Sequence, residues 1–131
     1  MTDVELETKV INNFVVSSKR ERYIRFISNS KTRKKFLEEL HRGNIFDDNL
    51  FKAIQKSADD SIINITEKLR IKDCYIISEN SEIDGKRLSI EDAINFAISA
   101  WCDTGTLIVF GDAHALYREH DGPNNKWISL V

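Results

Sequence analysis

Proline, cysteine and glycine are all scarce in this chain of 131 residues, which holds one proline, two cysteines and five glycines. With so little proline and glycine, a flexible low-complexity linker is not expected. The two cysteines, Cys74 and Cys102, have no C-x-x-C spacing. Reduced, buried thiols are therefore the simplest expectation for both.

Long apolar runs and catalytic signature motifs are also missing. No stretch approaches 18 consecutive apolar residues, and the first ten residues, MTDVELETKV, are acidic and contain no apolar signal core. A membrane span and classical secretion are therefore not expected, and we predict a cytoplasmic protein. The sequence contains no GxxxxGK[ST], GxGxxG, HExxH or GxSxG motif. We consequently expect no cofactor and no metal ion, and we favour a protein without catalytic activity.

The composition suits a small folded protein, with 41% hydrophobic and 31% charged residues. A division of 131 residues into two independent cores leaves each of them marginal, so we predict one domain over residues 1–131. Residues 1–16 are expected to form a loosely attached N-terminal segment.

Charge is distributed unevenly along the chain. Between residues 17 and 42, nine basic and three acidic residues give a net charge of +6. From residue 43 onward, nine basic residues face fifteen acidic ones, a net charge of −6, although the whole chain carries only −2. Such an electrical dipole orients encounters with a charged partner.

The basic segment has the pattern of two helices. Ser18 and Glu21 have capping-box spacing and predict a helix over about 19–28. A second helix, capped by Ser30 or Thr32, is expected to extend through Arg42 and to end at Gly43.

The remaining pattern is helical first and then mostly extended. A third helix is expected to begin at Asp47 or Asp48, with Leu50, Phe51 and Ile54 inward, and a fourth covers about 61–70. We then predict a strand over 74–78, a helix from the cap Ser89 to about 100, and strands over 106–110, 115–119 and 126–130. The expected fold is α+β: a helical N-terminal half packed on a small, mostly antiparallel sheet of about four strands with one further helix.

Two basic motifs and the C-terminal pattern carry a resemblance. Residues 19–23 read K-R-x-R-Y, residues 31–37 read K-x-R-K-K-F-L, and CYIISENSEIDGKRLSIEDAI, GTLIVFGDAHALYREHDG and KWISL follow. From about residue 18 onward, the chain resembles a group of small bacterial single-domain proteins whose function is unknown. The resemblance implies the architecture and a bacterial origin, and it implies no activity.

Basic side chains of the two helices are the candidate binding residues. A solvated basic face, contact with an acidic protein surface and contact with nucleic acid are all compatible with them. Tyr23 and Phe26 are needed for the helical core, and the isoelectric point of 5.9 does not indicate a nucleic-acid-binding protein. The candidates are Lys19, Arg20, Arg22, Arg25, Lys31, Arg33, Lys34 and Lys35.

Three further groups of residues have the side-chain types of a catalytic or metal site, but their patterns are weaker. Cys102, His114 and either Asp103 or Asp112 have the residue types of a nucleophilic relay, but Cys102 follows an apolar helical face. Asp112, His114 and His120, or the loop acids Glu79, Glu82 and Asp84, are possible metal ligands of poor spacing. Asp84, Gly85 and Lys86 loosely resemble a nuclease cluster placed on a turn.

Tyr75, Tyr117 and Trp127 are expected to cover the buried face of the sheet, the alternative being an exposed aromatic patch. Taken together, the sequence favours a non-catalytic protein-binding module, immunity- or inhibitor-like, that uses the basic helical face. The alternative is a nucleic-acid-associated protein that uses the same residues.

Overall fold

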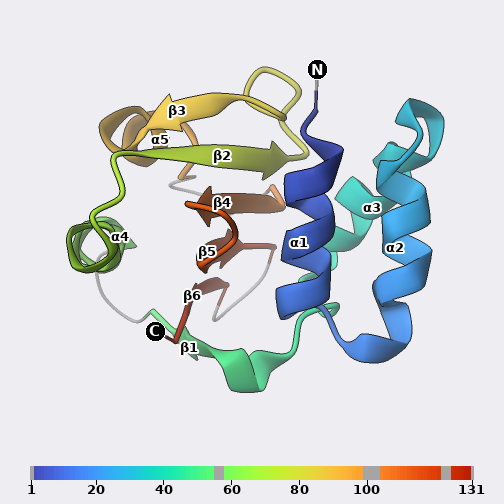
Figure 1. Cartoon of the computed structure of the whole chain (residues 1–131), viewed down its shortest axis with the longest axis horizontal. Coiled ribbons are helices and arrows are strands. Elements are labelled where there is room, and N and C mark those ends of the chain that lie inside the picture. Colours follow the sequence, from blue (N-terminus) through green and yellow to red (C-terminus); the bar gives the residue numbers. More distant parts are fainter. Residues whose placement is uncertain (1, 55–57, 99–103, 122–124, 131) are drawn as a thin grey trace.

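A computed structural model describes residues 2–54, 58–98, 104–121 and 125–130. Over these residues the chain is α+β, with a six-stranded antiparallel sheet between two groups of helices. Figure 1 shows α1, α2 and α3 on one side of the sheet and α4 and α5 on the other. The predicted fold class is thereby confirmed, with two more strands than expected.

The elements follow one another along the chain in this order: α1 (Val4–Phe14), η1 (Ser17–Lys19), α2 (Arg20–Ile27), α3 (Ser30–Arg42), η2 (Asp48–Leu50), β1 (Phe51–Ala53), α4 (Ala58–Leu69), β2 (Asp73–Ser78), β3 (Arg87–Ser89), α5 (Ile90–Phe96), β4 (Thr106–Phe110), β5 (Ala115–Glu119) and β6 (Lys126–Ser129). The strand order across the sheet is β1-β6-β5-β4-β2-β3, and every neighbouring pair is antiparallel.

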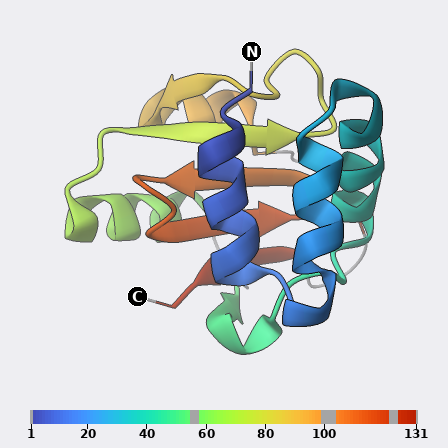
Figure 2. The same ribbon diagram turned by 45° about the vertical axis from the view of Figure 1, so that its right-hand side comes forward.

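The central strands β2, β4 and β5 are buried along almost their whole length because helices cover both faces of the sheet. On one face, Tyr75, Ile77 and Val109 pack with α1, α2 and α3. On the other face, Ile76, Ile108 and Tyr117 pack with α4 and α5. Figure 2 shows α1 lying across the strands, and this helix places a run of side chains directly against the sheet.

The N-terminal segment is therefore part of the core and not a loose attachment. Asp3 caps α1 by accepting a hydrogen bond from the Leu6 amide, and Leu6, Val10, Ile11 and Phe14 are buried. The apolar residues recur three or four positions apart, which gives α1 one buried stripe.

Three local predictions are wrong. Ser18 and Glu21 form no capping box: Ser17–Lys19 is a short 3-10 helix, and α2 begins without a side-chain cap. Asn29, not Ser30 or Thr32, caps α3 by accepting from the Lys31 amide. The predicted cap Asp47 does accept from the Asn49 amide, but it opens only the short 3-10 helix η2, and β1 follows in place of the expected third helix.

Other local predictions are confirmed. Gly43 ends α3 in the left-handed conformation (φ 71°), which costs glycine little. Ser89 caps α5 through the Asp92 amide, and the four predicted strands are β2, β4, β5 and β6.

Candidate functional site

Five of the eight predicted binding residues are exposed on the paired helices α2 and α3. We call them the basic surface: Arg22, Arg25, Lys31, Lys34 and Lys35. Lys19 and Arg20 are half-buried at its edge, where the Arg20 Nε donates to the Val15 carbonyl at 2.8 Å. None of the five forms an ion pair in the part of the chain that the structure describes.

Arg33 does not belong to this surface, which corrects the prediction. Its side chain is 8% exposed and points inward from α3, where it pairs with Glu7 of α1 and with Asp84 of the loop between β2 and β3. Because both partners are carboxylates, the charge of Arg33 is neutralised inside the protein. It is not available to a partner.

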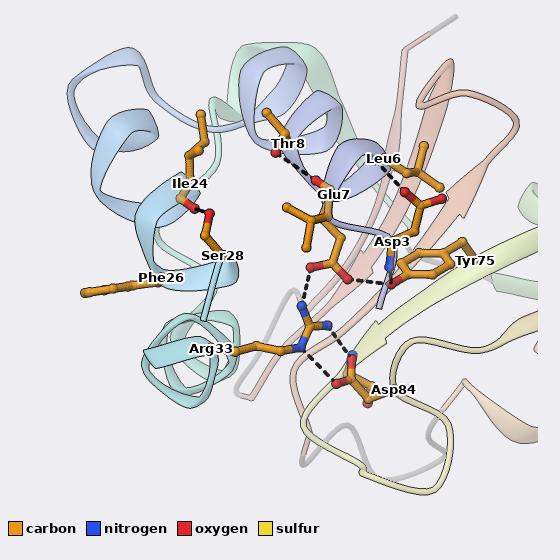
Figure 3. Close-up of polar contacts among 12 residues, drawn as sticks. Asp3, Leu6, Glu7, Thr8, Ile24, Phe26, Ser28, Arg33, Tyr75 and Asp84 are labelled. Carbon is orange, nitrogen blue, oxygen red and sulfur yellow. Dashed lines mark hydrogen bonds and ion pairs between the residues drawn. The ribbon is translucent and has the colours of Figure 1, made fainter. Parts of the chain in front are cut away.

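A polar cluster forms around Arg33, and Figure 3 shows its members converging from α1, α3, β2 and the loop between β2 and β3. The guanidinium donates to both Asp84 oxygens, at 3.1 Å from Nε and 2.8 Å from Nη2. The Tyr75 hydroxyl donates to Glu7 Oε2 at 2.5 Å and accepts from the Asp3 amide at 2.9 Å. This cluster connects α1, α3, β2 and the 79–86 loop, and so it fixes α3, one of the two helices that carry the basic surface, against α1 and the sheet.

Burial and hydrogen bonding together set the ionisation of this cluster. Burial raises the pKa of the Glu7 carboxyl, although hydrogen bonds from Arg33 and Tyr75 act in the opposite direction. Burial alone lowers the pKa of Arg33, but the hydrogen bonds to Asp84 and Glu7 outweigh it and raise that pKa above its ordinary value. Burial, followed by the hydrogen bond to Glu7, also raises the pKa of the Tyr75 phenol. Arg33 is thus a fixed cation, and the raised pKa of Glu7 makes its carboxyl easier to protonate.

One aromatic ring lies within the basic surface. The partly buried Phe26 has the Arg22 guanidinium carbon 5.4 Å from its ring centroid and the Lys35 Nζ 5.7 Å from it. Both distances allow cation–π attraction. The ring therefore joins a cation of α2 to a cation of α3.

The nucleophilic relay finds no support among the described residues. Cys102 and Asp103 lie outside them. Asp112 forms an exposed ion pair with Lys9 (2.7 Å), and its amide donates to Nδ1 of the exposed His114. Burial raises the pKa of the other thiol, Cys74, to about 12, so Cys74 is protonated at neutral pH.

The proposed metal ligands are not brought together. His114 and His120 lie at opposite ends of β5. Glu79 binds His41 Nδ1 (2.9 Å) and the Gly105 amide (2.5 Å), whereas Asp84 binds Arg33. Among the residues that the structure describes, no group of three His, Cys, Asp or Glu side chains has the geometry to hold a metal ion. The nuclease-like cluster is not supported either, because the Arg33 guanidinium donates to both oxygens of Asp84.

The aromatic trio does not form an exposed patch. Tyr75 and Tyr117 are 1% and 0% exposed and face opposite sides of the sheet. Trp127 is partly buried on the Tyr75 side, where it packs against Arg118.

Sequence reasoning missed three buried charged residues: Glu7, Arg118 and its neighbour Glu119. Glu7 lies three residues before Val10 and seven before Phe14, on the apolar stripe of α1, so its position in the pattern was a visible signal. Arg118 lies in ALYRE, whose five residues are all buried, and the aromatic rings that surround it come from distant segments. No local signal indicates them.

Comparison with known proteins found no matching family model, no matching curated protein and no matching solved structure. Within the described ranges, none of the helices combines the length and the apolar character needed to cross a membrane.

Proposed function

We propose that this protein is a non-catalytic binding module whose basic surface contacts an acidic surface of another protein. The observation that carries the proposal is that Arg22, Arg25, Lys31, Lys34 and Lys35 are all exposed and that none has a carboxylate partner in the described chain. An exposed charge without an internal partner keeps its full field for an external one.

The shape of this surface also supports the proposal. The five cations stand on two helices that pack against each other, and the Arg33 cluster ties α3 to α1 and to the sheet. A preorganised surface loses less conformational freedom on binding than a flexible basic tail does. Complementary charge then raises the association rate and selects the partner.

An immunity-like or inhibitor-like role, in which such a module covers part of an enzyme, is the concrete form of this proposal. It is an analogy from the size and charge of the chain. Bacterial origin and a cytoplasmic location belong to the same proposal.

The test compares three forms of the tagged protein as baits in a bacterial lysate at low salt. The first is wild type, the second carries Arg22→Glu, Arg25→Glu and Lys34→Glu, and the third carries Lys52→Glu, Lys72→Glu and Lys86→Glu. The three control lysines are exposed and lie outside α2 and α3, so both variants change the net charge equally.

The proposal predicts a protein that is recovered by wild type and by the control variant after nuclease treatment, and that the basic-surface variant loses. Equal recovery by all three forms contradicts it. Recovery that disappears with nuclease, together with binding of wild type to arbitrary DNA or RNA that falls steeply with salt, replaces it with the nucleic-acid alternative.

A further inference from the structure

The basic surface contains an apolar centre, and its position bears on the kind of acidic partner that it fits. Arg22, Phe26 and Lys35 form what we call the Phe26 cluster, with one cation from each helix over a single ring. In Figure 3 the Phe26 side chain points away from the Arg33 cluster. The ring is thus directed away from the two carboxylates, Glu7 and Asp84, with which Arg33 pairs.

Phe26 is held in place by a chain of aromatic contacts. Its ring centroid lies 6.1 Å from that of Tyr23, which in turn lies 5.5 Å from that of Phe36. Tyr23 and Phe36 are 1% and 0% exposed, whereas Phe26 is only partly buried. The chain of rings therefore runs from the core to the surface, so Phe26 needs little ordering when a partner covers it.

Hydroxyl groups at the end of α2 and in the first turn of α3 fix the same region. The Thr32 hydroxyl donates to the Phe26 carbonyl at 2.8 Å, and the Ser28 hydroxyl donates to the Ile24 carbonyl at 2.7 Å. These bonds satisfy carbonyls at the end of α2 that have no partner within the helix. The backbone that carries Phe26 is accordingly ordered on both sides of the ring.

Arg22 and Lys35 are held over the ring and are not neutralised by it. A cation–π contact orients a cation but leaves its charge available, unlike the two carboxylates that neutralise Arg33. Arginine and aromatic residues at the centre of a patch, inside a polar rim, are the usual composition of binding hot spots. A purely electrostatic surface does not require the ring at all.

We infer that the Phe26 cluster is the anchor of the interface, and that it takes an acidic protein segment in which an apolar side chain stands between carboxylates. The apolar side chain covers Phe26, and the carboxylates pair with Arg22 and Lys35. This inference rests on the proposed function, because it names the partner chemistry of the same surface.

Two synthetic probes separate this inference from simple charge attraction. One is a blocked peptide of about seven glutamates, and the other is the same peptide with leucine at its central position. Each is titrated at low salt into wild type, Phe26→Ala, Arg22→Gln/Lys35→Gln and the control Phe96→Ala, with affinity read from backbone amide NMR shifts. Phe96 is a suitable control because it is a 66% exposed phenylalanine on α5, on the other side of the sheet.

We expect the leucine peptide to bind wild type roughly fivefold more tightly than the all-glutamate peptide, although it carries one charge fewer. The preference should persist in Phe96→Ala and disappear in Phe26→Ala, whose dispersed amide spectrum reports that it is folded. Arg22→Gln/Lys35→Gln leaves the ring in place, so it should weaken both peptides while keeping some preference.

Equal binding of the two peptides to wild type overturns the anchor and leaves the basic surface as an electrostatic site. A preference that survives in Phe26→Ala also overturns it. If neither peptide shifts the amides of α2 and α3, the acidic partner of the proposed function fails together with the anchor.

Discussion

The protein buries two arginines on the same side of its sheet, and they are satisfied in different ways. Arg33 is paired with Glu7 and Asp84, and its surroundings are carboxylates and a phenol. Arg118 is surrounded by rings: its guanidinium carbon lies 4.8 Å from the Phe46 centroid, 4.5 Å from Phe51 and 4.8 Å from Trp127. It also donates to the Gly43 carbonyl at 3.1 Å and pairs with Asp48.

The difference lies in where the partner carboxylates are. The Glu7 side chain is 0% exposed, so its charge depends entirely on Arg33 and Tyr75. The Asp48 side chain is 65% exposed and is hydrated whether or not Arg118 is present. Removing Arg33 therefore leaves a buried carboxylate without its main partner, whereas removing Arg118 leaves a hydrated one. This is the main difference between the two regions.

The two arginines also differ in their own charge. Burial lowers the pKa of Arg118 more than Asp48 raises it, and its Nε is buried without a partner among the described atoms. For Arg33 the hydrogen bonds to the two carboxylates outweigh burial, and they raise the pKa of the guanidinium. The Arg33 cluster is hence an ionic connection between elements, and the Arg118 site is mainly a packed one.

Arg33→Met breaks the first region and should have the largest effect. It leaves the Glu7 carboxylate buried with only Tyr75 as donor, so we expect the free energy of unfolding to fall by about 3–5 kcal/mol. Urea denaturation measures this loss. Lys34→Met, which removes an exposed neighbouring charge, should change it by less than about 0.5 kcal/mol.

The double variant Glu7→Gln/Arg33→Met tests whether the unpaired Glu7 carboxylate causes this loss. Because it removes the fully buried Glu7 charge together with Arg33, and Asp84 is 16% exposed and still accepts from the Ser78 amide, it should recover most of the loss. If Arg33→Met alone lowers the free energy of unfolding by less than about 1 kcal/mol, that result would falsify the claim that buried Glu7 needs Arg33 as its partner.

Arg118→Met breaks the second region and should cost less, about 1–2 kcal/mol, because methionine fills the ring-lined site and Asp48 stays hydrated. The same denaturation experiment measures it. Arg87→Met is the matched control, since Arg87 also lies over a ring, that of Tyr75 at 5.4 Å, and pairs with Asp3, but is 57% exposed. A loss for Arg118→Met that equals the Arg33→Met loss contradicts the comparison.

Much of the fold could be predicted because its pattern is local. The strands β2, β4, β5 and β6 appear as compact apolar or alternating runs, and Gly43 and Ser89 end and begin helices by their own chemistry. These features need no knowledge of distant residues.

β1 could not be predicted in this way. Leu50, Phe51 and Ile54 have helical spacing, but tertiary partners decide their conformation. The Phe51 ring packs with Phe14 at 5.6 Å and with Phe46 at 5.9 Å, and the Ile54 amide donates to the Lys126 carbonyl at the edge of β6. The contacts with Phe14 and Lys126 join residues that are far apart in the sequence.

The candidate site shows the same limit. The exposed cations of α2 and α3 followed from their positions off the apolar stripe, whereas Arg33 has the same neighbours in sequence and is buried. Its inward position depends on Glu7, a residue 26 positions earlier. One-dimensional patterns cannot tell a surface cation from one that has a distant carboxylate.

The cost of Arg33→Met should depend on pH, which sharpens the comparison. The folded pKa of Glu7 is already raised above 4.5, and losing Arg33 raises it further. A carboxyl with a raised folded pKa adds stability below its unfolded pKa and loses that contribution as pH rises through the folded value.

The difference between wild type and Arg33→Met should accordingly shrink by about 1 kcal/mol or more between about pH 7 and about pH 4. Urea denaturation at several pH values measures this change. The Arg118→Met difference should shrink less, because no fully buried carboxyl loses its partner there. Parallel pH profiles for the two variants contradict this assignment.

Tyr75→Phe removes one hydroxyl from the first region and should have the smallest effect, about 1 kcal/mol. The hydroxyl donates to Glu7 and accepts from the Asp3 amide, but Arg33 still pairs with Glu7 after its loss. Since the Tyr75 hydrogen bond lowers the pKa of Glu7, the variant should also raise that pKa, which an NMR titration of the Glu7 carboxyl measures directly. A loss of stability with no rise in the Glu7 pKa assigns the hydroxyl to the Asp3 amide and the start of α1. A rise in the pKa shows that Arg33 and Tyr75 together hold the charge of Glu7.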